Sequence, residues 1–425
     1  MFELEKNGTT VRTELLAGLT TYVTMVYITF VNPAILAETG MDKGAVFVAT
    51  CLAAAFGSAF MGLYANYPVA LAPGMGLNAY FTYSVVKGLG ISWQAALGAV
   101  FLSGILFLLV SVTPVRKWII NSISRSLKLA ISVGIGFFLA VIGLQSAGII
   151  VADPTTLVTV GDLKSTGTAI AVLAFVLMGA LSARKVHGAI LIGVLAAYVA
   201  GLALGLSTFS GVASLPPSIA PVLLQMDVAS ALDVGMAAIV FTFLFVVLFD
   251  NTGTLIGVAH AAGMVQPDGS VPRIGRALAV DSTATMVGAA LGTSSTTSYV
   301  ESAAGVQAGG RTGLVALTVA VLFLLTLFLA PLAGSVPAFA TAPALVFVGC
   351  LMIAGARDID YADATEYVPA AVTIVSMPLT YSIADGIAFG LVTYAGIKLV
   401  AGRFHEISPA VAILAALFVI KFAFL

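Results

Sequence analysis

The sequence predicts an all-α polytopic membrane protein, and composition, charge and the length of the apolar runs carry this prediction. Hydrophobic residues fill 60% of the 425 positions and charged residues only 9%, with a mean hydropathy of +1.11. A soluble domain does not carry that balance. Apolar runs of about 20 residues recur, the length of helix that crosses a hydrocarbon core of about 30 Å. The lipid bilayer is therefore the expected environment. A net charge of −1 without a basic tail argues against nucleic acid as a partner.

The apolar runs, read between charges and Pro or Gly clusters, predict fourteen transmembrane helices in two sets of seven. The first set covers residues 15–36, 45–63, 69–86, 93–112, 127–149, 168–181 and 189–206. A polar, proline-containing stretch at 207–233 separates the sets. The second set covers residues 234–261, 274–291, 297–308, 314–332, 344–356, 368–383 and 387–400. A last apolar segment, 409–425, has a length that suits either a span or a position along the interface, and it stays outside the count.

The distribution of basic residues supports this count, because cytoplasmic loops hold most of the Lys and Arg residues of a membrane protein. With a cytoplasmic N-terminus, the opposite side of the membrane receives only Lys43, Lys87 and Lys164. The cytoplasmic side receives fourteen basic residues: Lys6, Arg12, Arg116, Lys117, Arg125, Lys128, Arg184, Lys185, Arg273, Arg276, Arg311, Arg357, Lys398 and Arg403. A missed or an invented helix would mix the two groups. The asymmetry therefore favours fourteen helices and a cytoplasmic N-terminus.

The two sets are expected to be inverted repeats, because an odd number of helices makes the second set start on the opposite side. Corresponding positions carry corresponding interruptions. Asn32 follows an apolar run in the first helix of one set, and Asp250 does so in the other. The third helices are interrupted at 72–78 and at 292–301. Unwound backbone at membrane depth survives only where it lines a cavity, and the half-helix after each break offers free N–H groups to a polar ligand. The paired breaks predict a transporter site.

Three carboxylates lie inside predicted spans: Asp250, Glu301 and Asp281. A carboxylate at membrane depth is costly and usually functional. We therefore expect Asp250 and Glu301 to bind substrate, and all three to be candidates for holding the proton that couples transport to a gradient. Structural roles remain open alternatives. Asp250 could cap an unwound stretch, Glu301 could bond a hydroxyl within 293–298, and Asp281 could join helices through neighbouring hydroxyls such as that of Ser282.

Two further side chains near the breaks suit a flat heterocyclic ligand. Asn78 offers both a donor and an acceptor, as recognition of a base edge requires, or else a bond between helices. Tyr299 can stack on a planar ring or serve as packing. The three histidines form no metal-ligand pair, so no metal or organic cofactor is expected. The proton is the only coupling ion that we predict.

These motifs resemble the adenine/guanine/hypoxanthine permeases, the AzgA-like branch of the nucleobase-ascorbate transporters. The resemblance covers essentially the whole chain. It rests on four segments: 16–22 (LAGLTTY), 72–81 (APGMGLNAYF), 249–254 (FDNTGT) and 292–302 (GTSSTTSYVES).

The resemblance implies two inverted seven-helix repeats, sorted into a core and a gate. The core would comprise helices one to four and eight to eleven, residues 1–112 and 234–332. The gate would comprise helices five to seven and twelve to fourteen, residues 113–233 and 333–425. Short antiparallel β-strands are expected at the breaks in helices three and ten. Relatives of this kind form homodimers through the gate, and their core moves against the gate as an elevator.

The resemblance also assigns the site and the activity. Asp250 and Glu301 match the binding carboxylates of helices eight and ten, and Asn78 matches the polar position of helix three. Thr254 stands where related uracil permeases carry a histidine, so its role as a substrate-binding residue is an open expectation. The expected activity is import of purine nucleobases (adenine, guanine, hypoxanthine) by proton symport across a bacterial inner membrane.

Two other functions fit the sequence less well. An anion transporter or channel of the sulfate-transporter-like fold would share this architecture, but two carboxylates at the site disfavour an anionic substrate. An intramembrane enzyme would need a metal-ligand motif or a nucleophile beside a base, and the sequence offers neither. We therefore expect a transporter and not an enzyme.

Overall fold

The protein is a multi-pass helical membrane protein. The computed structural model describes residues 2–113, 122–266 and 271–424. Nine helices within these residues are long and apolar enough to cross a membrane. The other five predicted spans fall on two broken segments and on three helices that are shorter or less apolar. Arg116 and Lys117, counted above with the cytoplasmic charges, lie outside the described residues.

The first half of the chain follows the predicted order of helices, with a kink in the first span, a break in the third and one addition. It contains α1 (Val11–Met25), α2 (Ile28–Ala37), α3 (Lys43–Phe60), β1 (Leu71–Pro73), α4 (Met75–Ala79), α5 (Trp93–Val112), α7 (Arg125–Ser146), α8 (Thr166–Ala183) and α9 (Ala189–Ala203). Two π-helical segments, Met61–Ala65 and Tyr80–Gly88, continue α3 and α4. The addition is an antiparallel hairpin of β2 (Ile150–Asp153) and β3 (Leu157–Val160), which the apolar pattern did not predict.

The second half begins after a long connection that holds the short α10 (Val228–Ala231) and a 3-10 turn at Val234–Met236. It contains α11 (Ala237–Ala261), α12 (Ile274–Leu291), β4 (Thr296–Ser298), α13 (Ser302–Gln307), α14 (Gly313–Thr326), α15 (Ala330–Ser335), α16 (Ala338–Ile353), α17 (Ala364–Thr380), α18 (Ile383–Val400) and α19 (Pro409–Phe424). The span predicted at 314–332 is divided, because a 3-10 turn at Leu327–Leu329 separates α14 from α15. The undecided segment 409–425 forms α19, which packs against α18.

Polar side chains at helix starts explain several of these boundaries. Asp42 accepts a 2.7 Å hydrogen bond from the Ala45 N–H at the start of α3. Ser124 and Ser382 cap α7 and α18 in the same way. Such a side chain satisfies one of the N–H groups that the first turn of a helix leaves without a partner.

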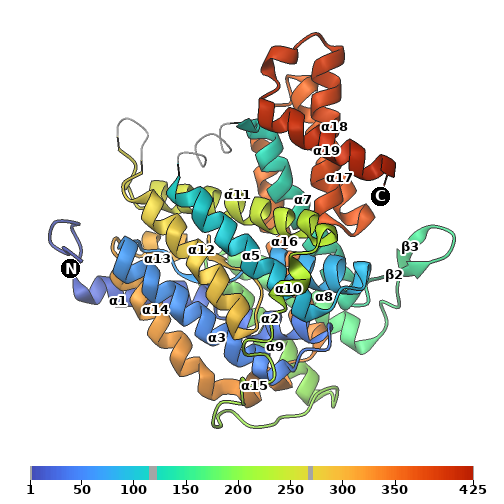
Figure 1. Ribbon diagram of the computed structural model, residues 1–425. Helices are drawn as coiled ribbons and strands as arrows, with labels where there is room; N and C mark the ends of the chain where they lie inside the picture. The colour runs from blue at the N-terminus through green and yellow to red at the C-terminus, as the bar shows by residue number, and fades with distance from the viewer. Residues whose placement is uncertain (1, 114–121, 267–270, 425) are drawn as a thin grey trace.

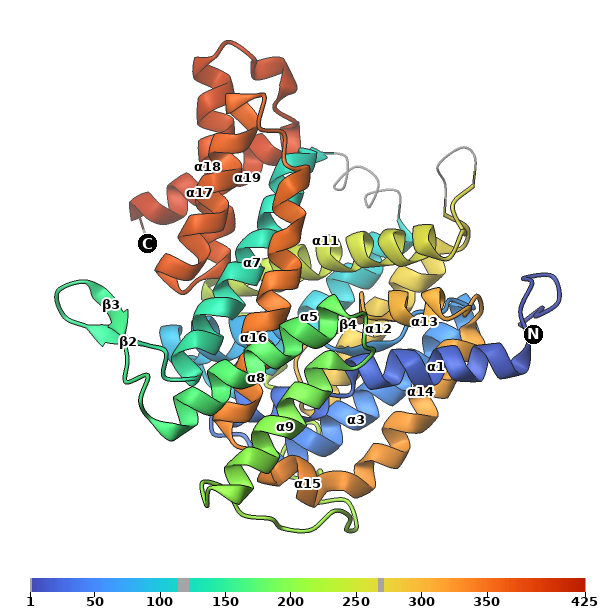
Figure 2. The same cartoon turned by 180° about the vertical axis from the view of Figure 1, so that it is seen from behind.

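The helices pack in two groups. In one, α3 lies against α14 and α12, α5 against α12 and α11, and α1 against α14. In the other, α7 runs beside α16 and α17, while α8 and α9 lie side by side against α16 (Figure 2). The helices α17, α18 and α19 stand together at one end of the molecule (Figure 1). The helices of the second group come from two stretches of the chain. One stretch, α7 to α9, comes after α5, and the other begins with α16, directly after α15.

Glycine pairs let helices within each group approach to backbone contact. A Cβ added at Gly313 of α14 would lie 2.1 Å from the Gly62 carbonyl oxygen. In the other group, a Cβ added at Gly349 of α16 would lie 2.5 Å from the Gly136 carbonyl oxygen of α7. Small residues at such crossings are how membrane helices gain packing, because lipid supplies little hydrophobic drive for their association.

The two interrupted segments meet as a two-stranded antiparallel sheet. Leu71, Ala72 and Pro73 of β1 face residues 298, 297 and 296 of β4, and every residue of both strands is buried. The pairing extends beyond the strands, because the Gly74 N–H donates to the Ser295 carbonyl at 2.9 Å. Ser58 of α3 also bonds both backbone groups of Leu71. The strands expected at the two breaks are thus confirmed, and their backbone polar groups find partners without water.

Candidate functional site

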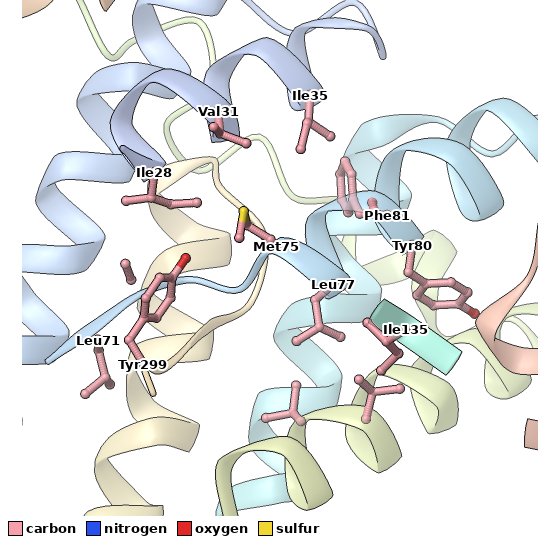
Figure 3. Close-up of a cluster of buried hydrophobic side chains, with 14 of the residues drawn as sticks. Ile28, Val31, Ile35, Leu71, Met75, Leu77, Tyr80, Phe81, Ile135 and Tyr299 are labelled. Carbon is pink, nitrogen blue, oxygen red and sulfur yellow. The ribbon is translucent and has the colours of Figure 1, made fainter. Parts of the chain in front are cut away.

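The strand pair lies at the centre of the molecule, with the beginning of α4 at one end of it and the beginning of α13 at the other. Figure 3 shows the apolar surroundings: Ile28 and Val31 of α2 lie near Met75 of α4, Ile35 lies beside Phe81, and the Tyr299 ring lies between Leu71 and Ile28. The Tyr299 hydroxyl donates to the Pro73 carbonyl at 2.5 Å. Tyr299 is 6% exposed, and this bond ties its side chain to the opposite strand, β1.

Glu301 lies at the N-terminal end of α13, three residues after β4. Its Oε1 atom accepts a 2.7 Å hydrogen bond from the hydroxyl of Tyr27. Tyr27 is fully buried at the junction of α1 and α2. Glu301 therefore bonds Tyr27, and not a hydroxyl of residues 293–298 as the structural alternative had it. Glu301 as a whole is of intermediate exposure.

Asp250 lies within α11, which is continuous from Ala237 to Ala261. An uninterrupted helix has no unwound stretch to cap, so the structural alternative for Asp250 is wrong. The helix packs against both β4 and α13, and Asp250 is close enough to Glu301 to interact electrostatically. Its side chain is partly exposed. Thr254, one turn later on α11, is partly exposed as well.

Asp281 of α12 is fully buried and linked to β4. Its Oδ1 atom accepts a 2.8 Å hydrogen bond from the Ser298 hydroxyl, while Oδ2 has no partner. Ser282, the neighbour considered from sequence, instead bonds its own helix at the Leu278 carbonyl. Asp250 lies near both of the other predicted carboxylates. Asp281 is the most deeply buried of the three, since Asp250 and Glu301 are of intermediate exposure.

Asn78 of α4 joins this region from the other broken segment. It is fully buried, and its Oδ1 atom accepts a hydrogen bond from the Ser294 hydroxyl, just before β4. Its Nδ2 group has no partner. The Asn78 amide therefore links the two broken segments, as expected if its role is a hydrogen bond between helices. Its N–H donors are still available for a ligand.

Tyr27 and Asn251 also belong to the site, although the sequence alone did not assign them to it. Tyr27 holds Glu301, and no spacing in the sequence signals a contact between them. Asn251 follows Asp250 on α11, is fully buried, and has neither its Nδ2 nor its Oδ1 atom paired. A buried amide without partners is rare and needs an explanation. The sequence signal that could have assigned Asn251 to the site is its position in the motif 249–254.

The chemistry of this arrangement suits an uncharged polar ligand better than a metal ion. Two partly exposed carboxylates offer acceptors for N–H groups, while Asn78 and Asn251 have unused donors. In the part of the chain that the structure describes, no three His, Cys, Asp or Glu side chains gather in a way that could hold a metal ion.

Comparison with known proteins identifies the family. The chain is 48% identical over 425 residues to the adenine permease AdeP of Escherichia coli (strain K12), covering 100% of this chain and 96% of that protein. It is 44% identical over 429 residues to the guanine/hypoxanthine permease PbuO of Bacillus subtilis (strain 168), covering 99% of each. The model of the permease family matches residues 12–389. The chain belongs to this permease family. The resemblance read from the four motifs is thereby confirmed.

The fold of this permease also occurs in distant transporters. The transmembrane domain of the cyanobacterial bicarbonate transporter BicA superposes with a TM-score of 0.63, covering 88% of this chain and 96% of that domain. The sequences are 16% identical, so the likeness concerns the fold alone. A fold shared with an anion transporter is what the anion-transporter alternative assumed.

Proposed function

We propose that this permease imports purine nucleobases, with adenine, guanine and hypoxanthine as the candidate substrates. The observation that carries the proposal is the packing of α11, which bears Asp250, against β4 and α13, which place Glu301 beside the paired breaks. The names of the relatives AdeP and PbuO support a purine ligand. A purine presents N–H donors and ring-nitrogen acceptors on one flat edge, which two carboxylates and the amide of Asn78 can match.

The roles of the individual residues follow from their positions. Asp250 and Glu301 accept hydrogen bonds from the base, and Asn78 donates to it. Tyr299 supplies the aromatic surface beside β1, and Thr254 contributes a hydroxyl from the next turn of α11. Substrate specificity then depends on which edge of the base these groups face.

The architecture that we propose has fourteen transmembrane helices in two inverted repeats of seven. Support comes from the antiparallel pairing of the two breaks, which an inverted relation between the repeats produces. Residues 1–112 and 234–332 form the core that carries the base, and residues 113–233 and 333–425 form the gate. The core moves against the gate as an elevator, and two gates associate in a homodimer. The protein lies in the bacterial inner membrane with its N-terminus in the cytoplasm.

Transport is coupled to the proton gradient in this proposal. Glu301, Asp250 and Asp281 are the carboxyls that can carry a proton at membrane depth, and their clustering lets a proton and a base affect one another. Adenine accumulation should stop when a protonophore collapses the gradient. Accumulation that continues unchanged would show that the coupling is to something else.

The site itself is tested by uptake of radiolabelled adenine, guanine and hypoxanthine in cells without their own purine transporters. Asp250→Asn and Glu301→Gln should each abolish uptake while the protein still reaches the membrane. The matched control is Glu5→Gln, a carboxylate removed from an exposed position near the N-terminus. Full uptake by both site variants would refute the proposal.

An anion carrier is the rival that the likeness to BicA brings forward. The carboxylates at the site oppose it, because like charges at close range disfavour binding. Bicarbonate or sulfate currents without purine binding would favour this rival. Chemical turnover of a bound purine by the purified protein would instead indicate an enzyme.

A further inference from the structure

A largely open pocket, which we call the outer chamber, lies apart from the site described above, between the end of α2 and the π-helical segment Tyr80–Gly88 on one side and α7 with the α17–α18 turn on the other. Its volume is about 580 Å³. Small-molecule sites usually enclose between about 300 and 1,000 Å³. None of the residues assigned to the purine site lines it. Six of its lining residues have polar or aromatic side chains: Glu38, Tyr83, Lys87, Gln145, Ser146 and Tyr381.

One wall of this outer chamber is charged but internally neutralised. Lys87 forms a 2.7 Å ion pair with Glu38, and the Tyr83 hydroxyl donates to the other oxygen of Glu38 at 2.7 Å. The Lys87 ammonium also lies 5.4 Å from the centre of the Tyr83 ring. Because the charges cancel within the wall, the chamber offers little to a free cation or anion. An uncharged polar molecule fits this wall better.

The other wall is polar and aromatic. The Tyr381 hydroxyl donates to the side-chain oxygen of Gln145, which leaves the amide N–H groups of Gln145 as donors at the chamber surface. Ser146 adds an exposed hydroxyl. A flat heterocycle with polar edges can stack on the ring of Tyr83 or Tyr381, which lie on opposite sides, and hydrogen-bond to the carboxamide of Gln145.

Tyr381 is held rigidly in this wall. Its φ angle is +53°, in the left-handed region that a bulky residue adopts only when its surroundings impose it. The Ser84 hydroxyl donates to its carbonyl at 2.6 Å, and its ring meets that of Phe138 edge to face with 5.8 Å between centroids. The aromatic surface is therefore in place before any ligand arrives, which lowers the entropy cost of binding.

We propose that this outer chamber is a second binding site for uncharged planar bases, occupied before a base reaches Asp250 and Glu301. The proposal rests on the purine transport proposed above. The side of the membrane follows from Lys87, one of the three basic residues on the side expected to be extracytoplasmic. Substrate would be collected there between core and gate, stacked on Tyr83 or Tyr381 and bonded at its edge by Gln145.

The test is protection of a single thiol from a membrane-impermeant maleimide in intact cells. The background is Cys350→Ser, which removes the exposed native thiol; the other cysteine, Cys51, is fully buried. Ser146→Cys then places a thiol at the chamber. Adenine, and hypoxanthine in a separate arm, should slow its labelling at least threefold. Val160→Cys, on the exposed hairpin β2–β3, is the control that neither base should protect.

A second variant separates the chamber from the inner site. Adding Glu301→Gln to Ser146→Cys should abolish uptake and leave the protection of the thiol in place. Adding Gln145→Leu should reduce that protection, with about threefold to tenfold more adenine needed, as the loss of one hydrogen bond predicts. Protection that disappears with Glu301→Gln would overturn the proposal, because it would then report on the inner site. So would the absence of protection in a background that takes up adenine. Failure of purine transport itself would show as no adenine uptake by the Cys350→Ser parent.

Discussion

The hydroxyl of Tyr27 donates a 2.7 Å hydrogen bond to Glu301, across 274 positions of sequence. The bond joins the kink between α1 and α2 to the start of α13, so it connects the first helix of one half to the broken helix of the other. It also fixes the side chain that we propose as a ligand for the base. Loss of the Tyr27 hydroxyl should therefore weaken substrate binding.

Tyr27→Phe should weaken adenine binding by about tenfold or more, because a hydrogen bond to a charged group contributes about 1.5 to 3 kcal/mol. Binding is measured by titrating detergent-solubilised protein with adenine. Tyr64→Phe serves as the control, since Tyr64 is 48% exposed. Equal affinities for Tyr27→Phe and the parent would mean that Glu301 keeps its position without this bond.

Asn251 and Asn32 make a matched pair of buried amides with opposite expected behaviour. Asn32 donates to Thr50 at 2.7 Å and to Thr293 at 2.9 Å, whereas neither amide atom of Asn251 has a partner. Asn32→Leu should therefore lower the free energy of unfolding by about 1 to 3 kcal/mol. Asn251→Leu should leave it unchanged or raise it, and should reduce purine uptake at least tenfold. Thermal unfolding and uptake are measured on the same variants; an unstable but fully active Asn251→Leu protein would contradict this assignment.

Much of this site could be predicted because its residues carry their own signals. Proline and glycine at 72–76 and the hydroxyl run at 293–298 mark backbone that cannot be regular helix, and the strands β1 and β4 form there. Carboxylates such as Asp250 and Glu301 stand out against an apolar sequence. The positions of the helices follow from the same contrast.

The contacts between these residues were beyond prediction from one sequence. Nothing in the local pattern relates Tyr27 to Glu301 or Asp281 to Ser298, because tertiary packing alone brings them together. The hairpin β2–β3 was missed since it lies in an exposed loop, where alternation of apolar residues does not report on a core. The outer chamber was missed for a similar reason: its lining comes from four separate segments.

The crossing of α14 with the π-helical end of α3 should fail when its glycine is enlarged. A Cβ at Gly313 would lie 2.1 Å from a backbone oxygen of Gly62, and backbone cannot move aside as a side chain can. Gly313→Ala should lower the free energy of unfolding by about 1 to 3 kcal/mol. Gly179→Ala on α8, where an added Cβ meets nothing within 4 Å, should be neutral or slightly stabilising. Thermal unfolding in detergent distinguishes the two; equal melting temperatures would show that the helices separate without cost.

A network of ion pairs beside α18 should make stability depend on pH below the usual carboxylate range. The backbone N–H of Thr365 and the guanidinium of Arg403 lower the pKa of Asp363 from 3.8 to about 2. Hydrogen bonds from Arg403 and Lys398 lower the pKa of Glu406 from 4.5 to about 2.

A carboxyl whose pKa is lower in the folded state stabilises the fold fully above its unfolded pKa and loses that effect as the pH falls to the folded value. The network should therefore stabilise the protein above about pH 4.5 and weaken progressively down to about pH 2. Arg403→Gln should flatten this part of the curve of melting temperature against pH. Arg357→Gln should leave the curve unchanged, because its contact to Asp358 is 3.8 Å long and exposed. Curves for Arg403→Gln and the parent that stay parallel through this range would show that the ion pairs do not hold these carboxylates in their charged form.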